Sequence, residues 1–336
     1  MVLNLDQYLN EELGETSVKV KKILDEVIPQ KKPDILYEAS RHLIIAGGKM
    51  LRPYVVIKSC EAVGGDEDTA LPAAAAIELL HTFTLIHDDI MDNGKVRRGV
   101  SAVHVQWDIP TAIMAGDLLF AKVYKTLVEG LGRKKILSER IVKATGVIAE
   151  AAITICEGQM LDMSFSKLEK VLEEEYLVMV EKKTSSLFKT SAEVGALVGG
   201  GTDWQIEKLG CYAKFMGTAF QIVDDVLGLE AEEKELGKPV GSDLKEGKKT
   251  LPVIFALQQA NKSQKKTILN AMKKTSTKKE ILEAKKVIEE LGGVDYSMKK
   301  AEQFVEQALK QLEPLPQTKA KESLTTLTKF VIKRKF

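Results

Sequence analysis

Apolar residues recur along most of the chain at intervals of three and four positions, which is the period of an amphipathic α-helix. Alternating runs of β-branched residues bounded by turn signals, which would indicate strands, are missing from the sequence. We therefore predict an all-α fold. Helices are expected at Asp34–Ala46, Pro53–Val63, Asp68–Met91, Thr111–Glu129, Leu137–Met163, Leu168–Leu197, Trp204–Ala231, Pro252–Ala260, Ser263–Lys273, Lys278–Glu290, Val294–Gln311 and Lys319–Ile332.

Glycine and proline mark the ends of these elements. Gly47 and Gly48 end one helix, and Pro53 opens the next in its first turn, where a missing backbone N–H does no harm. The stretch GKPVGSD at 237–243 is too rich in glycine and proline to be helical, and such loops often carry function. No repeat or linker divides the chain. We therefore expect a single domain over residues 1–336, built as one large helical bundle around a central cavity.

Two of the predicted helices are apolar on most of their surface and carry paired aspartates toward their C-terminal ends. In the first, Asp88 and Asp92 of HDDIMD lie about 40° apart in helical projection, so they share one face, with Asp89 beside them. Their mutual repulsion and the partial negative charge of a helix C-terminus favour a compensating cation. Carboxylates without histidine or cysteine suit Mg²⁺, although a solvated acidic helix end is the ordinary alternative for one such cluster.

A second pair, Asp224 and Asp225, also follows an apolar run, and carboxylates on facing helices of a bundle can assemble a metal site. Basic residues near the predicted helix ends supply the charge that a metal-bound anion needs, since guanidinium groups bind phosphate oxygens in pairs. They are Lys49, Arg52, Arg97, Arg98, Lys183, Lys238 and Lys248. The glycine-rich signatures of P-loop and Rossmann phosphate sites are absent from the sequence. The pattern predicts a metal-assisted diphosphate site.

The overall composition narrows the partners and the location. The 49 basic and 48 acidic residues nearly cancel, so nothing global points to nucleic acid. Cys60, Cys156 and Cys211 are far apart, and we expect small buried side chains in a reducing compartment. The first residues lack the layout of a signal peptide, and no run of about 18 apolar residues predicts a membrane span. We expect a cytoplasmic protein.

The ordered motifs resemble those of the trans-prenyl diphosphate synthases, in particular the archaeal short-chain geranylgeranyl and farnesyl diphosphate synthases. They run from about residue 42 to 252 and read GGKMLRP, LLHTFTLIHDDIMD, NGKVRRG, EKKTSSLF, FQIVDDVLG and LGKPVGSDLKEGKKTLP. The resemblance implies a polyprenyl synthase domain of the isoprenoid synthase type, usually a homodimer. It would add isopentenyl diphosphate head to tail to allylic diphosphates.

The resemblance also implies a role for each matching residue. Two to three Mg²⁺ ions per active site are expected on Asp88, Asp92 and Asp224, with help from Asp89, Asp225 and Asp243. Isopentenyl diphosphate is expected at Lys49, Arg52, His81 and Arg98. The allylic diphosphate is expected at Arg97, Lys183, Thr184, Gln221, Lys238 and Lys248, of which Lys183, Thr184 and Gln221 take a catalytic part. The basic end of the chain, residues 330–336, is similar to a closing flap of the family.

One position departs from the family pattern. The second aspartate motif usually reads DDxxD, whereas here it reads DDVLG, so Gly228 stands where the third aspartate is expected. This puts the metal arrangement on that side in doubt. A non-catalytic partner subunit of the same fold stays open as an alternative for this reason. A terpene cyclase is a second alternative, but it would not need the second anion site that GGKMLRP and RRG indicate.

The length of the product can be argued from the helix that carries Asp88. The growing chain is expected to run down this helix, and one turn of about 5.4 Å is comparable with one isoprene unit. Phe83 and Thr84 lie about one turn below Asp88. A single aromatic beside a small residue leaves more room than two aromatics would. By the family pattern this favours a geranylgeranyl (C20) product over a farnesyl (C15) product, with a mixture as the alternative.

Overall fold

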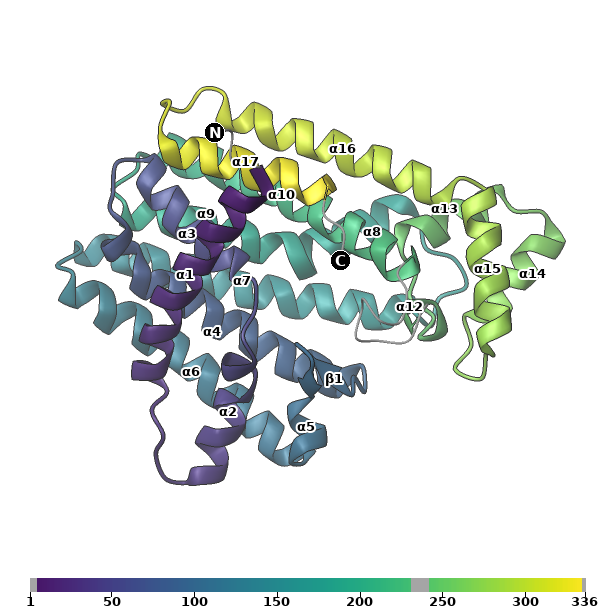
Figure 1. Ribbon diagram of the computed structural model, residues 1–336, viewed down its shortest axis with the longest axis horizontal. Helices are drawn as coiled ribbons and strands as arrows, with labels where there is room; N and C mark the ends of the chain where they lie inside the picture. The colour runs from purple at the N-terminus through teal and green to yellow at the C-terminus, as the bar shows by residue number, and fades with distance from the viewer. Residues whose placement is uncertain (1–4, 231–241, 334–336) are drawn as a thin grey trace. The chain divides into compact units, whose positions relative to one another are not determined.

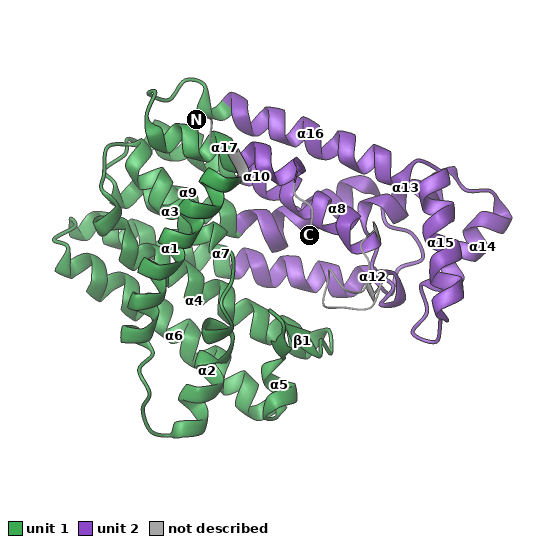
Figure 2. Ribbon diagram, viewed as in Figure 1, with its two compact units in different colours: residues 1–152, 187–213, 311–327 green, residues 153–186, 214–310, 328–336 purple. Residues whose placement is uncertain are grey.

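The computed structural model describes residues 5–230 and 242–333, and Figure 1 shows that these form helices joined by short connections. The all-α prediction is confirmed. The chain divides into two compact units, coloured separately in Figure 2. Unit 1 comprises residues 1–152, 187–213 and 311–327, and unit 2 comprises residues 153–186, 214–310 and 328–336.

The elements follow in chain order. Unit 1 contains α1 (Leu5–Val27), α2 (Asp34–Ala46), α3 (Leu51–Ala62), α4 (Glu67–Met91), β1 (Val96–Arg97), β2 (Val100–Ser101), α5 (Val103–Gln106) and α6 (Ile109–Arg133). Unit 2 contains α8 (Glu173–Val180), the π-helical turn η1 (Glu181–Ser185), α12 (Ser242–Lys245), α13 (Leu251–Gln259), α14 (Lys262–Ala271) and α15 (Lys278–Glu290). Both units receive residues from α7 (Ser138–Phe165), α9 (Ser186–Val198), α10 (Asp203–Glu230), α16 (Gly293–Leu312) and α17 (Lys319–Lys333).

Helix α4 is the core helix of unit 1. It begins where the Asp66 side chain accepts a hydrogen bond from the Thr69 backbone N–H at 2.8 Å, which satisfies one of the free donors of the first turn. Residues 72–80 are buried without interruption, and α4 packs against α3 and α6. By length and composition α4 could cross a membrane, but 67% of its apolar window is buried inside the structure, as in the core helix of a folded domain.

The core of unit 2 joins the end of α10 to four later helices. Leu229 of α10 and Leu244 of α12 belong to one buried apolar cluster, together with Val253 and Ala256 of α13 and Ile268 of α14. Residues of α15 complete this cluster. Burying these side chains fixes α12 beside the last turn of α10, although the two are distant in sequence.

The predicted helix Leu168–Leu197 is wrong at its start and in its regularity. The helix begins at Glu173, because the Glu175 carboxylate accepts the Leu172 backbone N–H at 2.8 Å and closes the first turn. The acidic run of 173–175 suits a helix N-terminus. Further on, the helix widens into the π-helical turn η1 before it continues as α9.

The antiparallel hairpin of β1 and β2 was not predicted. Val96 pairs with Ser101 and Arg97 with Val100, so the loop consists of Arg98 and Gly99 alone. Both loop residues have positive φ, 52° and 76°, which two-residue hairpin turns of the I′ type require. Glycine adopts this conformation readily and arginine rarely, and for this reason the pattern around Arg98 did not indicate a turn.

The predicted burial of the cysteines is confirmed for one of the three and is wrong for the other two. Cys60 is buried, and burial, with the nearby Asp66 and Glu61, raises the pKa of its thiol to about 12. Cys156 is exposed and Cys211 is half-buried. Cys156 shares an exposed face of α7 with Ile153 and Met160. The apolar residues around Cys156 therefore do not indicate that this face of the helix is buried.

Candidate active site

The first aspartate group lies at the end of α4 in unit 1, and its members differ in environment. The Asp89 side chain is 1% exposed, whereas the Asp88 side chain is 21% exposed. Asp92 caps the C-terminus, where its backbone N–H donates to the Asp88 carbonyl at 2.8 Å. Asp88 is therefore partly accessible, whereas Asp89 is buried.

Arg97 holds Asp89. Its Nε and Nη2 atoms donate to Asp89 Oδ1 at 3.0 and 2.6 Å, and Nη2 lies 3.7 Å from Asp88 Oδ2. Burial works against the charge of Arg97, but the hydrogen bond and the charge of Asp89, with Asp88 and Asp92, raise the pKa of Arg97. The resemblance assigned Arg97 to the allylic diphosphate; the structure places it directly against the first aspartate group.

The next residue, Arg98, points to different partners. Its Nη2 donates to Glu78 Oε1 at 2.8 Å, and its Nη1 donates to the Leu43 carbonyl at 2.9 Å. A Cβ at Gly48 would lie 3.1 Å from the same guanidinium, so Arg98 supports the glycine turn that precedes Lys49. Lys49 itself is exposed. Glu78 was missed by the sequence analysis, although an acid in the run AAAAIELL is a signal of a buried partner.

Arg52 and His81 meet beside this group. Arg52 Nη1 lies 3.3 Å from His81 Nε2, and because arginine can only donate, Nε2 accepts and the ring proton is on Nδ1. The Arg52 guanidinium also stacks over Phe188 at 4.3 Å from the ring centroid. Burial, followed by the charges of Arg52, Arg98 and Arg97, lowers the pKa of His81 well below its ordinary value. His81 is thus a neutral hydrogen-bonding group among three arginines.

The two predicted chain-length residues lie on the same helix. Phe83 packs on Phe120 of α6 with ring centroids 5.0 Å apart, and Phe120 packs on Tyr124 at 5.4 Å. The Thr84 hydroxyl donates to the His81 carbonyl of its own helix at 2.8 Å. An aromatic row of α4 and α6 therefore lies about one turn below Asp88, and the sequence had identified only its first member.

In unit 2, Lys183 and Thr184 lie in the π-helical turn η1, a form of helix often found at functional sites. Lys183 Nζ donates to Asp162 Oδ2 of α7 at 2.5 Å. A Cβ at Gly158 would lie 2.3 Å from the Lys183 backbone nitrogen, so only glycine allows α7 and η1 to approach this closely. Sequence reasoning missed Asp162 and Gly158, because neither is near Lys183 in the chain.

Thr184, Gln221 and Asp225 form a hydrogen-bonded row. The Thr184 hydroxyl donates to Gln221 Oε1 at 2.8 Å, and Gln221 Nε2 donates to Asp225 Oδ1 at 2.7 Å. The Tyr176 hydroxyl donates to Asp225 Oδ2 at 2.7 Å. Because Asp225 can only accept when ionised, it sets the orientation of the Gln221 amide. Tyr176 was not singled out from the sequence.

The second aspartate pair therefore divides in the same way as the first. Asp225 is buried, and burial, with smaller contributions from the charges of Asp243 and Asp224, raises its pKa to about 7 against the hydrogen bonds from Tyr176 and Gln221. Asp224, the preceding residue, is exposed. In each pair one carboxylate is buried and its neighbour is more exposed.

The stretch 237–243, predicted to be a loop, lies mostly outside the described residues. Lys238 is among the residues not described, and the basic end of the chain is described only to Lys333. Asp243 is the second residue of α12, and Lys248 Nζ lies 3.5 Å from Asp243 Oδ1 and 3.2 Å from Glu246 Oε2. A Cβ at Gly228 would lie 2.9 Å from Asp243 Oδ2. Gly228, which stands where the family motif has its third aspartate, therefore lies next to Asp243.

The carboxylates of each unit suit a hard divalent cation. In unit 1 the Asp88 side chain is 21% exposed and in unit 2 Asp224 is exposed, and carboxylate oxygens are the ligands that Mg²⁺ prefers. Within residues 5–230 and 242–333, no three Asp, Glu, His or Cys side chains converge as a ready-made cage. In phosphate sites Mg²⁺ is usually held by one or two carboxylates together with substrate phosphates and water.

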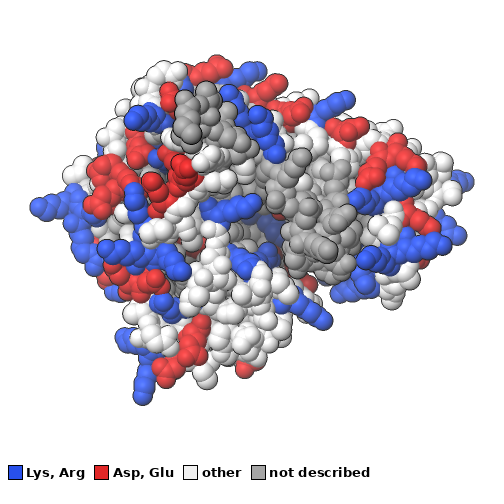
Figure 3. Space-filling model, viewed as in Figure 1, with Lys and Arg blue, Asp and Glu red and all other residues white. Residues whose placement is uncertain are grey.

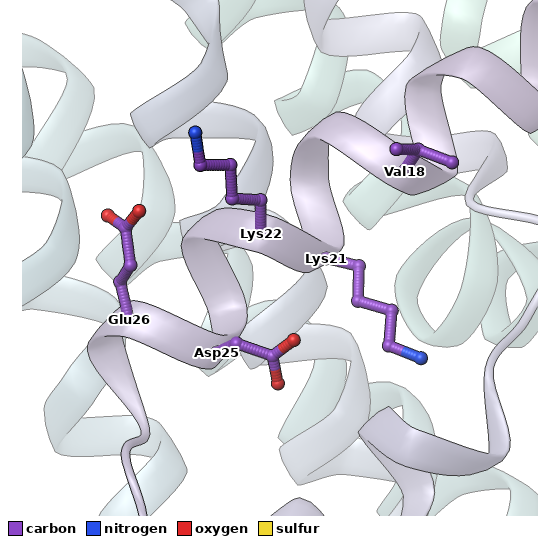
Figure 4. Close-up of a pocket in the computed structure, with 5 residues that line it drawn as sticks. All are labelled: Val18, Lys21, Lys22, Asp25 and Glu26. Carbon is purple, nitrogen blue, oxygen red and sulfur yellow. The ribbon is translucent and has the colours of Figure 1, made fainter.

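The charged side chains outside the two aspartate groups are arranged differently from those within them. Figure 3 shows acidic and basic side chains interspersed on the face in view. A shallow hollow on α1 is lined by Val18, Lys21, Lys22, Asp25 and Glu26. Figure 4 shows Lys22 and Glu26 on one side of the helix and Lys21 and Asp25 on the other, and Asp25 is bonded to Arg41 at 2.6 Å. These side chains do not converge on a common ligand.

Comparison with known proteins agrees with this chemistry, since the family model described as "Polyprenyl synthetase" matches residues 33–291. The chain belongs to the polyprenyl synthetase family. It is 41% identical over 336 residues to a geranylgeranyl diphosphate synthase of Sulfolobus acidocaldarius, covering 98% of each chain. It is also 41% identical over 308 residues to a geranylfarnesyl diphosphate synthase of Aeropyrum pernix, covering 90% of this chain and 95% of that one.

The structure is similar to a crystal structure of geranylgeranyl pyrophosphate synthetase from Pyrococcus horikoshii, with a TM-score of 0.92 and 40% identity. The match covers 99% of this chain and 100% of that one. The resemblance drawn from the motifs is thereby confirmed. Two relatives of equal identity carry different product names, so overall similarity does not set the product length.

A glycine substitution tests the support of the π-helical turn. Gly158→Ala is expected to lower the free energy of unfolding by about 1–3 kcal/mol, because the added methyl group meets the backbone of Lys182 and Lys183. Amide hydrogen exchange at 181–185 should become faster. Gly146→Ala on the same helix is the control, since nothing lies within 4 Å of its Cβ position. Equal stability and exchange in the two variants would contradict the support by Gly158.

Proposed function

We propose that this protein is a Mg²⁺-dependent trans-prenyl diphosphate synthase that condenses isopentenyl diphosphate head to tail with allylic diphosphates, with geranylgeranyl diphosphate as its main product. The observation that carries the proposal is the division of each aspartate pair, in which Asp88, 3.7 Å from Arg97, and Asp224 are the more exposed members. Membership of the polyprenyl synthetase family supports it. We propose that residues 1–336 act as one catalytic domain, because each unit carries only one aspartate group.

The allylic substrate must lose its diphosphate. We propose that two to three Mg²⁺ ions held by Asp88, Asp92 and Asp224 neutralise the leaving diphosphate when bound. Arg97, Lys183, Lys248 and Lys238 add positive charge, which is worth more in a site from which water is excluded. Asp89 and Asp225 have a supporting role, since each orients neighbouring side chains through the hydrogen bonds described above. The allylic C–O bond breaks, and its electron pair leaves with the diphosphate.

The carbocation that remains needs nearby electron density and no nucleophilic side chain. The row from Asp225 fixes the Gln221 amide so that its oxygen, with the Thr184 hydroxyl oxygen, presents partial negative charge. The double bond of isopentenyl diphosphate then attacks the allylic carbon and forms the new C–C bond. A proton leaves the new cation to the diphosphate by-product, which balances the reaction.

Isopentenyl diphosphate carries its own anionic group, and we assign this group to Lys49, Arg52, His81 and Arg98. A neutral His81 donates through Nδ1 without adding charge, while Arg52 and Lys49 supply it. Arg98 supports the glycine turn of Lys49 through its bonds to Glu78 and Leu43. The chain thus holds two anion sites, which a condensation of two diphosphates requires.

The proposed function is accompanied by proposals on the subunit association and on the location of the enzyme. We propose a homodimer, because α6 exposes Ile109, Ile113, Met114 and Val128 at 41–55%. Sedimentation velocity should find the 37.1 kDa chain as a species of twice that mass, and a monomer at micromolar concentration would contradict this. We expect the enzyme in the cytoplasm, which fractionation of its source cells would test.

The activity is tested with isopentenyl diphosphate and dimethylallyl, geranyl or farnesyl diphosphate, each with Mg²⁺. Chromatography should show mainly C20 diphosphate, and EDTA should abolish it. Asp88→Asn and Asp224→Asn should each lower the rate by roughly 10²-fold or more, since each removes charge that holds the leaving group. Asp203→Asn, an exposed change on the same helix as Asp224, is the control. A hydrocarbon formed from one allylic diphosphate alone would indicate a cyclase instead.

The product length is tested at the aromatic row of α4 and α6. Phe83→Ala is expected to shift the product from C20 toward C25, because the cavity gained is comparable with one isoprene unit. Phe120→Ala should act in the same direction, since Phe120 packs on Phe83. Phe304→Ala, an equal truncation at a stacked pair in unit 2, should leave the length unchanged. An unchanged length in both α4 and α6 variants would remove this row as the floor.

A further inference from the structure

A partly enclosed cavity of about 590 Å³ lies within unit 1. The end of α1, the start of α4 and the second half of α6 line it, and no residue of the two aspartate groups is among the lining residues. Ile23 and Val27 of α1 and Leu71 and Pro72 of α4 give it an apolar side. Pro72 and Asp88 are 16 residues apart on α4, which places the cavity about 24 Å along this helix from the first aspartate group. Cavities of this size bind small organic molecules.

Contacts between the three helices fix the walls of the cavity. Lys122 Nζ of α6 donates to the carbonyl of Val27, the last residue of α1, at 2.6 Å. Lys134, at the C-terminal end of α6, is paired with Asp68 in the first turn of α4. The three helices are therefore held together around the cavity, and a ligand does not have to assemble it.

Basic side chains are in excess around the cavity, four against three acidic ones. Lys125 is paired with Glu129, and Lys134 with Asp68, so these charges compensate each other. Lys122 is half-buried and has no carboxylate partner among the described residues. One of its three N–H groups is used by the carbonyl at the end of α1, so two are left to bind an anion.

The surroundings of the Lys122 ammonium disfavour its charge. Burial, followed by the charges of Lys125 and Lys31, lowers the pKa of Lys122, and the charge of Glu129 opposes this. Three lysines are thus close enough to act on one another, and an anion bound among them would relieve their repulsion. A phosphate group carries about two negative charges and three acceptor oxygens, so it can compensate more than one of these cations.

Thr126 adds a second polar group to the same place. It lies one turn after Lys122 on α6, on the same face, and also lines the cavity. The residue is 4% exposed, and its hydroxyl oxygen is buried with no hydrogen-bond partner within residues 5–230 and 242–333. Thr145 of α7 donates to the carbonyl four positions back, as helical threonines can, but Thr126 does not. A buried hydroxyl without a partner destabilises a folded protein, and an acceptor in the cavity would supply the partner.

We propose that this cavity is a further binding site of the protein, for a small organic phosphate whose phosphate group is bound by Lys122 and Thr126. The ammonium and the hydroxyl donate to phosphate oxygens, and the apolar part of the ligand packs on the side formed by α1 and α4. The inference goes beyond the proposed function and does not depend on it, since neither aspartate group takes part. Val128, on the α6 face proposed for the homodimer, lies about 160° around the helix from Thr126, so the two faces are distinct.

The test measures binding by isothermal titration calorimetry in EDTA, which keeps divalent cations from the aspartates. The probes are geranyl diphosphate and adenosine monophosphate, two organic phosphates with different organic parts, and inorganic phosphate and geraniol, which represent the separate portions. At least one organic phosphate should bind the parent about tenfold or more tightly than inorganic phosphate or geraniol, because both portions contribute. The one that binds identifies the source of the ligand as a prenyl compound or a nucleotide.

Two variants assign the binding to this cavity. Lys122→Gln should weaken the binding of that probe about tenfold or more, because a charge-assisted hydrogen bond is lost. Thr126→Val, which keeps the shape of the side chain, should weaken it about fivefold through the loss of one hydrogen bond. The melting temperature of Thr126→Val without ligand should equal or exceed that of the parent, since a buried hydroxyl without a partner is removed. Lys143→Gln, which removes an exposed charge of unit 1 on α7, is the matched control and should bind the probe as the parent does.

The inference is overturned if neither organic phosphate binds, if inorganic phosphate binds as tightly as both, or if Thr126→Val binds the probe as the parent does. Thermal unfolding checks that each variant is folded, and should Lys122→Gln unfold through the loss of its bond to α1, Thr126→Val decides alone. Turnover with isopentenyl and allylic diphosphates tests the proposed function separately, so a failure of one is distinguishable from a failure of the other.

Discussion

Two adjacent carboxylates on one helix repel each other, and the rest of the site is arranged around this constraint. Both aspartate pairs meet it in the same way. One member is turned into the protein and bonded there, Asp89 by Arg97 and Asp225 by Tyr176 and Gln221. The other member is more accessible, Asp88 partly exposed and Asp224 exposed, so that a cation could compensate its charge. The buried carboxylates of Asp89 and Asp225 therefore orient the side chains that bond to them, which are Arg97, Tyr176 and Gln221.

The predicted parts of the fold are those that depend on local pattern. The 3.6-residue period located α4 and α10, and the apolar length of both marked them as core helices. Carboxylates at a spacing of one turn identified Asp88 and Asp92 as a pair, since helical geometry alone brings them to one face. Arg98 and Gly99 show the opposite case, because a hairpin turn with an arginine at positive φ carries no composition signal.

The parts that the sequence did not reveal are contacts between distant segments. Nothing near Asp225 in the chain indicates that Tyr176 bonds to it, because the contact arises from the packing of α8 against α10. The same holds for Asp162 with Lys183 and for Gly158 below η1. Gly228 is a further case, because only the structure reveals that Asp243 Oδ2 lies 2.9 Å from its Cβ position.

The hairpin of β1 and β2 has a mechanical consequence. Arg97 and Arg98 are consecutive, yet one is bonded to Asp89 near the end of α4 and the other to Glu78 about three turns earlier and to the carbonyl of Leu43 on α2. The two-residue turn thus joins contacts at the acidic end of α4 to contacts at Glu78 and at Leu43, which precedes the glycine turn. Because one peptide unit links Arg97 and Arg98, a displacement of the hairpin would move both sets of contacts together.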